Sequence, residues 1–491
     1  MRLRPQSRNV MKKWIKQLGK DSLVYGIGGV VARGLGFFLL PIYTRIFSIA
    51  DYGLIELITV VCMFAFAVIA GGTDGSLEFY FTERAEEGPQ TQARVVTSVL
   101  LWRVVWGGVV VGIVLLLAPL LNTLLQYDIP ITLLSIAITS VFLAGLTGPM
   151  LSVFRLLFKP WWYVGISLLG TVAAAATTIV LVVRFDMGVM GALIGACVGA
   201  AMVSVLGLWG VRQYLSWQPQ FRQWCPRLLR FGLPLMPTAL ALYVLNSCDR
   251  FFIVRFHGDD ALGLYSVGAK FALIISLMVI TFRQAWWPTA LKAMQDPEGP
   301  LVFRTIARLY LGTGVIAVIW LSALAPYLTA WMTAPDYHAA FPIVGALSWS
   351  ALLYGFYLIG CAGIWKVKKT FWAGATMAAA AVANLILNCL LVPRFGGLGA
   401  AVGTSVSFFL WNIAVLLISE RLWRVGHSLV TLGLQIVVGV TVCCCIHRFY
   451  QDQMSPWLPF AFTVAATLLL VPTLMTRQHW GDVRAWLRHR H

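Results

Sequence analysis

The stretch Arg45-Ile46-Phe47-Ser48-Ile49-Ala50-Asp51-Tyr52-Gly53-Leu54 decides the fold, because a related stretch returns 210 residues later as Arg255-Phe256-His257 through Leu262-Gly263-Leu264. Two further echoes follow in the same order. Ala118-Pro119-Leu120 returns as Ala325-Pro326-Tyr327, and Arg184-Phe185 with Gly191-Ala192 returns as Arg394-Phe395 with Gly399-Ala400. Three ordered echoes indicate an internal duplication. In a hydrophobic chain, such a duplication is typical of transporters whose two halves move about a site between them.

The composition indicates that this duplicated chain lies in a lipid bilayer. Of its 491 residues, 59% are hydrophobic and only 11% are charged, and the mean hydropathy of +0.81 is far from that of soluble proteins. Apolar runs of about 20 residues, enough to cross a membrane as a helix, recur along the chain. We therefore expect an all-α, polytopic membrane protein with about 14 transmembrane helices. These are predicted at 22–43, 52–72, 95–118, 130–153, 162–183, 187–211, 231–254, 262–284, 305–332, 339–361, 370–392, 397–419, 428–447 and 456–475.

The echoes divide these spans into two pseudo-symmetric six-helix lobes followed by a C-terminal helix pair. The linker between the lobes mixes Trp217, Phe221 and Trp224 with arginines, which predicts an amphipathic helix at the cytoplasmic interface. The predicted organisation is a basic cytoplasmic tail (1–21), an N-lobe with spans one to six (22–211), the cytoplasmic amphipathic linker (212–230), a C-lobe with spans seven to twelve (231–419), spans thirteen and fourteen (420–476), and a basic cytoplasmic tail (477–491).

The distribution of basic residues gives the orientation. If the N-terminal tail is cytoplasmic, the cytoplasmic segments hold 26 Lys and Arg residues and the outer loops hold five. This asymmetry is what the positive-inside bias produces, so both termini are predicted to be cytoplasmic. The net charge of +18 is then explained by orientation and by anionic membrane lipids, and nucleic acid is not an expected partner.

Motifs of enzymes and metal sites are absent from the sequence. The nine cysteines include no paired spacing of the kind that ligates zinc or iron–sulfur clusters, so no metal and no cofactor are predicted. The sequence also has no Gly-x-Ser-x-Gly elbow, no His-Glu-x-x-His pair and no phosphate-binding loop. We therefore expect a protein that is not an enzyme.

Charged side chains inside the predicted spans are the main candidates for function. Placing Arg or Lys at the centre of a membrane costs roughly 2.5–3.5 kcal/mol, so such residues need polar surroundings or access to the interface. Three of them lie near a cytoplasmic end, where a long side chain can reach water. These are Arg103, Arg283 and Arg308.

The remaining basic residues within spans are Arg33, Arg250 and Lys270. We predict that they bind substrate, because basic groups lining a wet cavity suit a large anion such as a diphosphate. A structural ion network of Asp249 with Arg250 and Lys270 explains part of the same pattern and stays open.

Four acidic residues are candidates for gating or ion coupling. Asp249 and Glu56 lie within predicted spans, whereas Asp74 and Glu78 lie in the polar connection 73–94. A solvated loop is the simpler explanation for that connection. The coupling ion would be H+ or Na+, and the sequence does not choose between them.

The sequence around spans seven and eight carries a family resemblance. Phe231-Gly-Leu-Pro234-Leu-Met-Pro237, Leu245-Asn-Ser-Cys-Asp249-Arg250-Phe and Gly263-Leu-Tyr265-Ser-Val-Gly-Ala-Lys270 resemble these helices in Wzx-type oligosaccharide-lipid flippases. Those flippases belong to the multidrug/oligosaccharidyl-lipid/polysaccharide flippase superfamily. Arg33-Gly-Leu-Gly-Phe-Phe is similar to the first helix of the peptidoglycan-precursor flippase, in which the residue matching Arg33 lines the central cavity.

The resemblance implies a flippase that moves polyprenyl-diphosphate-linked oligosaccharide across the bacterial inner membrane by alternating access, for O-antigen, capsule or exopolysaccharide biosynthesis. Its implied partners are the lipid-linked oligosaccharide, membrane lipids, and the polysaccharide polymerase and export machinery. A multidrug or cation antiporter of the same fold is the main alternative, although such antiporters favour an acidic cavity. A membrane polysaccharide polymerase or ligase is a weaker alternative, because the predicted outer loops are too short to hold catalytic groups.

The predicted topology can be tested by cysteine labelling on a cysteine-free background. Single cysteines placed at Asp128 and Asp336 should react with an impermeant reagent added from outside, whereas one placed at Lys368 should not, because the charge asymmetry puts Lys368 in the cytoplasm. The reverse labelling pattern would overturn the orientation.

Overall fold

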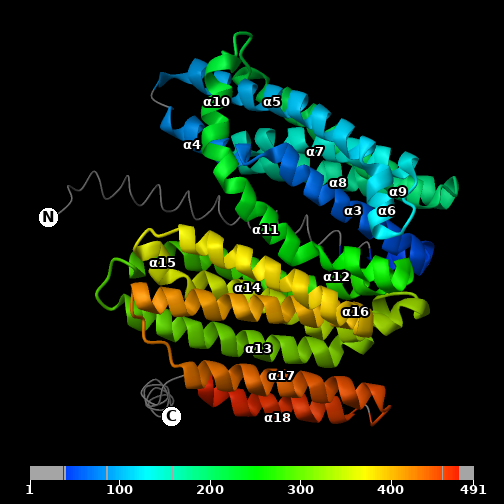
Figure 1. Cartoon of the computed structure of the whole chain (residues 1–491), viewed down its shortest axis with the longest axis vertical. Coiled ribbons are helices and arrows are strands. Elements are labelled where there is room, and N and C mark those ends of the chain that lie inside the picture. Colours follow the sequence, from blue (N-terminus) through cyan, green and yellow to red (C-terminus); the bar gives the residue numbers. More distant parts are fainter. Residues whose placement is uncertain (1–36, 38–39, 85–86, 158, 456, 475–491) are drawn as a thin grey trace, which may run out of the picture. The chain divides into compact units, whose positions relative to one another are not determined.

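The computed structural model describes residues 37, 40–84, 87–157, 159–455 and 457–474, and all regular structure in these ranges is helical. The chain forms two compact units. The first comprises Met1–Tyr243 with Gly258–Gly263, and the second comprises Val244–His257 with Leu264–His491. Figure 1 shows the helices of each unit coloured along the sequence.

Eleven segments of the described chain are long and apolar enough to cross a membrane. Two of them, Met236–Gln284 and Phe371–Leu422, have 49 and 52 residues, so each is long enough for two crossings. Each contains one glycine outside helical geometry, Gly258 with φ 78° and Gly396 with φ 55°. The all-α, multi-pass fold is thereby confirmed. The count of fourteen stays a prediction, because most of the first span (22–43) lies outside the described residues.

The first unit contains the helices of the predicted N-lobe and the linker. The serine at the start of its first long helix forms a capping box: the Ser48 hydroxyl accepts a bond from the Asp51 backbone at 3.1 Å, and the Ser48 backbone donates to the Asp51 carboxylate. The helices are α2 (Leu40–Ile46), α3 (Ile49–Ala70), α4 (Thr73–Glu83), α5 (Pro89–Leu116), α6 (Ala118–Leu125), α7 (Ile131–Leu156), α8 (Pro160–Ile179), a π-helical turn (Val180–Arg184), α9 (Gly188–Val211), a 3-10 turn (Arg212–Tyr214), α10 (Phe221–Gly232), a 3-10 turn (Leu233–Leu235) and the first part of α11 (Met236–Ser247).

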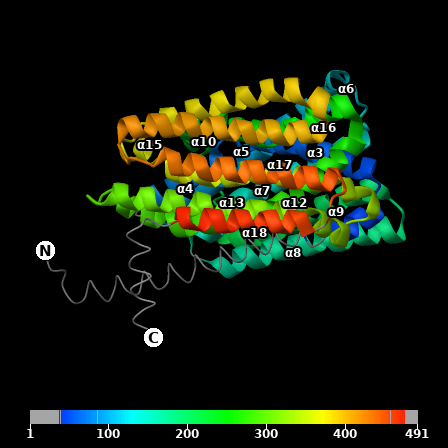
Figure 2. The same ribbon diagram turned by 90° about the horizontal axis from the view of Figure 1, so that it is seen from below.

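The second unit contains the remaining helices, including the C-terminal pair. The pair α17 and α18 lies side by side, and both helices pack on α13 (Figures 1 and 2). The helices are the end of α11, α12 (Asp249–Ala293, apart from Gly258–Gly263), α13 (Gly299–Met332), a 3-10 turn (Pro335–Ala340), α14 (Phe341–Gly360), α15 (Ala362–Lys366), α16 (Phe371–Leu422), α17 (Leu429–Gln451) and α18 (Trp457–Leu474).

The echoed glycines form a reciprocal backbone contact within the first unit. A Cβ added to Gly53 would overlap the carbonyl group of Asp259, and a Cβ added to Gly263 would overlap the carbonyl oxygen of Ile49. Ile49 and Asp259 are equivalent positions of the duplicated stretch, as are the two glycines. The repeat thus packs against its own copy where only glycine fits. Tyr127 adds a hydrogen bond of 2.9 Å from its hydroxyl to the Asp259 carboxylate.

This contact predicts a matched pair of sensitive positions. Gly53→Leu and Gly263→Leu should each destabilise the purified protein by about 1–3 kcal/mol, because the added side chain overlaps backbone that cannot move away. Gly112→Leu is the control, since a Cβ at Gly112 meets nothing within 4 Å. Thermal unfolding in detergent is the measurement. Equal stability of all three variants would show that the contact does not constrain the fold.

Candidate coupling and substrate sites

The structure places the predicted site residues on several helices. Arg33 lies outside the described residues. Glu56 is half-buried in α3, and Asp74 and Glu78 lie one turn apart in α4. Segment 73–83 is therefore helical, and the expectation of a simple solvated loop is wrong for this part of the connection.

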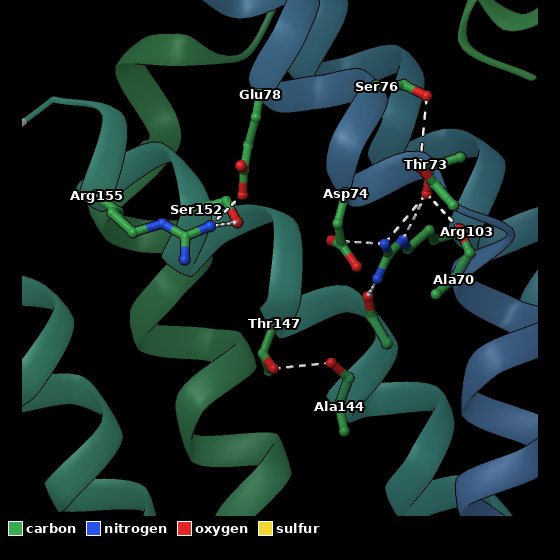
Figure 3. A network of polar contacts seen from close by, with 12 residues as sticks. Ala70, Thr73, Asp74, Ser76, Glu78, Arg103, Ala144, Thr147, Ser152 and Arg155 are labelled. Carbon is green, nitrogen blue, oxygen red and sulfur yellow. Dashed lines mark hydrogen bonds and ion pairs between the residues drawn. The ribbon is translucent and has the colours of Figure 1, made fainter. Parts of the chain in front are cut away.

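Arg103 of α5 is a fully buried charged side chain of the first unit, with 0% exposure. Its Nη2 lies 2.7 Å from the Asp74 carboxylate, and its Nε and Nη2 donate to the Thr73 hydroxyl at 3.2 and 3.1 Å (Figure 3). Its Nη1 donates to the carbonyl oxygen of Gly145 in α7 at 2.6 Å. The expectation that Arg103 reaches the interface is wrong, because the guanidinium is held by partners on α4 and α7.

The bond from Arg103 pairs the Gly145 carbonyl, which has no hydrogen-bond donor within α7. Pro149 lies inside this helix, and proline has no N–H to donate to the carbonyl four residues before it, which is that of Gly145. An unpaired carbonyl is expensive in an apolar environment. The guanidinium of Arg103 supplies the missing donor, so a buried arginine and a helix-breaking proline stabilise each other.

Glu78 forms a second ion pair of the first unit. Its carboxylate accepts a bond from Arg155 of α7, whose Nη2 also lies 3.3 Å from the Ser152 hydroxyl (Figure 3). Both members of the pair are close to half exposed, so solvent screens their interaction. Of the two predicted acids of α4, Asp74 is therefore the one tied to a buried partner.

Asp249 is a buried carboxylate of the second unit, with 1% exposure. It accepts bonds from the Arg250 backbone at 2.9 Å and from the Arg250 guanidinium at 3.0 Å. The Tyr265 hydroxyl also donates to it, and the Thr404 hydroxyl donates at 3.3 Å. One carboxylate thus connects the start of α12 with α16.

Two asparagines extend this polar cluster within α16. Asn384 donates from its amide to the Thr404 hydroxyl at 3.3 Å, and Asn388 donates to the Asn384 carbonyl at 3.0 Å. The Cys248 thiol donates to the same Asn384 oxygen at 3.0 Å. Both asparagines are fully buried, and the Asn388 side-chain oxygen has no hydrogen-bond partner among the described residues. Their spacing of four residues in an apolar helix was the signal that sequence reasoning missed.

The cluster contains one carboxylate, Asp249, which is paired with the Arg250 guanidinium and lies among hydroxyl and amide groups. Among the described residues, no group of three or more His, Cys, Asp or Glu side chains is placed to hold a metal ion. Carboxylate, hydroxyl and amide oxygens suit protons and hard cations, and a single negative charge suits a monovalent one. Because Arg250 already balances the charge of Asp249, a proton or an alkali cation would have to compete with the guanidinium for this carboxylate.

Of the residues predicted to contact an anion, Arg250 belongs to this cluster. Arg250 is 12% exposed in its side chain and also donates to the Asn246 carbonyl at 2.9 Å. Its guanidinium lies over the Tyr265 ring at 5.5 Å. Lys270 is half-buried in α12. The Asp249–Arg250 ion pair belongs to the structure, whereas an energetic coupling of Asp249 with Lys270 stays a prediction.

Comparison with known proteins gives the family. Residues 18–294, more than half of the chain, match the family described as "Polysaccharide biosynthesis protein". The chain belongs to this family. "Lsg locus putative protein 1" of Haemophilus influenzae is 25% identical over 289 residues, covering 57% of this chain and 67% of that protein. An "Uncharacterized membrane protein" of the same organism is 24% identical over 274 residues, covering 55% and 64%. The chain thus spans about two thirds of these relatives.

The fold of this polysaccharide biosynthesis protein is shared with solved transporters. "Lipid II flippase MurJ, inward closed conformation" matches with a TM-score of 0.71 at 13% identity, covering 91% of this chain and 98% of that chain. An outward-facing multidrug resistance MATE family transporter of the MOP superfamily matches at 0.61 and 14% identity, over 84% and 97%. The Vibrio cholerae MATE transporter VcmN in the bent form matches at 0.54 and 16%, over 83% and 98%. These likenesses show that the chain has the fold of these transporters.

The link between Arg103 and Pro149 gives a test by paired substitution. Arg103→Leu should destabilise the protein by about 2–4 kcal/mol, because it leaves Asp74 without its buried partner and the Gly145 carbonyl without a donor. Adding Pro149→Ala should restore part of the loss, since alanine at 149 supplies an N–H to Gly145. Thermal unfolding of the purified variants measures both effects.

The control uses a proline elsewhere. Pro326 lies inside α13, and Pro326→Ala should not rescue Arg103→Leu, because it restores no donor to Gly145. Strict additivity of Arg103→Leu and Pro149→Ala would show that the two residues do not interact.

Proposed function

We propose that this protein is a flippase that carries polyprenyl-diphosphate-linked oligosaccharide across the bacterial inner membrane by alternating access. The glycan would serve O-antigen, capsule or exopolysaccharide biosynthesis. The observation that carries the proposal is the combination of a polysaccharide biosynthesis family with the fold of a lipid II flippase over 91% of the chain. The solved structures of the same fold are described as a flippase and transporters, which supports a protein that moves its substrate unchanged.

The physical problem of the substrate favours this function. A sugar chain cannot cross hydrocarbon unaided, because each unsatisfied polar group costs several kcal/mol there. Arg33, Arg250 and Lys270 are proposed to contact the diphosphate, since charge-assisted bonds to phosphate oxygens are short and strong. The polyprenyl chain would stay in the lipid while the sugar passes.

Asp249 is proposed to bind the coupling ion, H+ or Na+. Its carboxylate holds the Arg250 guanidinium at 3.0 Å, so a proton or cation on Asp249 would weaken that ion pair. Arg250 would then be released from its counter-charge and bind the diphosphate more strongly. Coupling of this kind is reciprocal, so the diphosphate would also raise the affinity of Asp249 for its ion.

The remaining predictions complete the proposed setting. Glu56, Asp74 and Glu78 are proposed gating residues, with Asp74 acting through its ion pair to Arg103. Both termini are proposed to lie in the cytoplasm. The lipid-linked oligosaccharide, membrane lipids and the polysaccharide polymerase and export machinery are the proposed partners.

The proposed activity predicts transport without ATP. Purified protein in liposomes should move a polyprenyl-diphosphate oligosaccharide to the far leaflet, measured as protection from or exposure to an external glycosidase under imposed H+ or Na+ gradients. Arg33→Ala and Arg250→Gln should each reduce transport at least about tenfold, because each removes a contact to the diphosphate.

Site variants distinguish the response to the coupling ion from the binding of the substrate. Asp249→Asn should abolish the response to the ion gradient, whereas Asp336→Asn, at an exposed carboxylate of the 3-10 turn before α14, should leave it unchanged. Movement of small cationic drugs in place of the glycan would favour the antiporter, whose fold this chain shares. A requirement for ATP would overturn the proposal.

A further inference from the structure

The linker between the predicted lobes presents a charged surface that the proposed transport does not use. Between Asp186 and Asp249 the sequence contains no acidic residue. Within this stretch four arginines are exposed, and we call them the linker arginines. They are Arg212, Arg222, Arg227 and Arg230.

The orientation of this surface is fixed by the burial of the opposite side of α10. Trp224 and Leu228 lie in one buried cluster with Leu77 of α4 and Val96 of α5. The Ser76 hydroxyl donates to the Leu228 carbonyl at 2.7 Å. The apolar side of the linker helix thus forms part of the protein core. The exposed side cannot turn inward without breaking that core.

The segment before α10 is also held in place, by hydrogen bonds to α5. The Ser98 hydroxyl donates to the Pro219 carbonyl at 3.0 Å, and the Ser216 backbone donates to the Thr97 hydroxyl at 2.9 Å. Trp217 lies between these two anchors, and its side chain is fully exposed at 102%. An aromatic ring held in the open on a pinned backbone is placed to enter the interface between lipid and water, where tryptophan is enriched.

Among the described residues, no acidic side chain neutralises the charges on this surface. Acidic residues in α4 and just after it pair with other arginines: Glu78 with Arg155, and Glu83 and Glu87 with Arg84. None of the linker arginines forms an ion pair in the described structure. The guanidinium groups of Arg212 and Arg227 lie over the faces of Trp209 and Trp224, at 5.3 Å each. The guanidinium groups therefore keep their hydrogen-bonding capacity for an external anion.

The linker also adjoins the ends of spanning helices that carry exposed tryptophans. Trp209 is an exposed residue near the end of the spanning segment Gly188–Tyr214, and Trp161 is exposed at the start of α8. Tryptophans at the ends of spans mark the boundary between lipid and water. α10 runs across the direction of α5 and α7 in the first unit, as expected for a helix along that boundary (Figure 1).

We propose that the linker arginines and Trp217 form a binding surface for the headgroups of anionic phospholipids. The arginine forks would bind lipid phosphates, and the indole of Trp217 would enter the interface beside them. Near a membrane each basic residue contributes about 1 kcal/mol of attraction to anionic lipid. The occupant is a phospholipid surface and not a soluble anion, because a fully exposed indole adds nothing to the binding of free phosphate.

The first test counts bound lipid on the full chain. Native mass spectrometry with phosphatidylglycerol should give a dissociation constant at least about tenfold lower for the natural chain than for the variant with all four linker arginines replaced by Gln. The matched control carries Lys368→Gln, Lys369→Gln, Arg421→Gln and Arg424→Gln, which remove the same charge from other exposed positions. This control should bind phosphatidylglycerol as the natural chain does.

A second test locates the contact. A bimane on Trp217→Cys, with the other cysteines replaced, should be quenched about twofold more by brominated phosphatidylglycerol than by brominated phosphatidylcholine, and high salt should remove the difference. Single variants Arg222→Gln and Arg230→Gln replace the fourfold variant if it does not fold. Equal quenching by both lipids, or loss of lipid binding in the control, would overturn the proposal. Release of the lipid by inorganic pyrophosphate would also overturn it and assign the surface to soluble or substrate diphosphate.

Discussion

The structure depends on one constraint, which is that a backbone group without water must find its partner within the protein. Helices meet this constraint everywhere except where they break. At Pro149 the carbonyl of Gly145 receives the Arg103 guanidinium. Near the break at Gly396, His257 bonds the Val392 carbonyl at 2.8 Å, and at the start of α15 the Gly363 backbone donates to the Ser419 hydroxyl at 2.7 Å. Polar side chains therefore follow the breaks of the helices, where they pair backbone groups that the helices leave without partners.

The duplication shows how the two halves came to differ under this constraint. Arg103 bonds the Gly145 carbonyl, and 207 residues later Tyr310 bonds the Leu352 carbonyl at 3.0 Å. Both copies thus keep a hydrogen bond between neighbouring helices. The donor is the charged Arg103, paired with Asp74, in the first copy, and the neutral Tyr310 hydroxyl in the second. The reverse holds for Asp249, whose counterpart 210 residues earlier is Leu39. Each half retains the architecture and carries a carboxylate–arginine pair of its own, with the arginine buried in the first and the carboxylate in the second.

Periodicity in the sequence was sufficient for the fold because lipid allows few alternatives to helices. The apolar runs gave the spans, and the echoes located equivalent turns: Asp186 and Gly396, 210 residues apart, both have positive φ. The candidate site was only partly predictable. Asp249 was evident as a charge in an apolar run, whereas Thr404 and Asn384 are neutral residues whose meaning depends on contacts with residues 155 and 136 positions away. The expectation that Arg103 reaches the interface was wrong because it rested on the distance of Arg103 from the end of its span. That distance does not show that Pro149 leaves the Gly145 carbonyl in need of a donor.

The ion pair of Asp249 with Arg250 also sets the charge balance of the proposed coupling. The pair is neutral as a whole, and both side chains are largely buried. In the proposed cycle, a proton or cation on Asp249 would leave the pair with one net positive charge, which is costly in a buried site. A diphosphate at Arg250 would offset that charge. The proposed ion and the proposed anionic substrate would therefore each favour the binding of the other, because each removes the charge imbalance that the other creates.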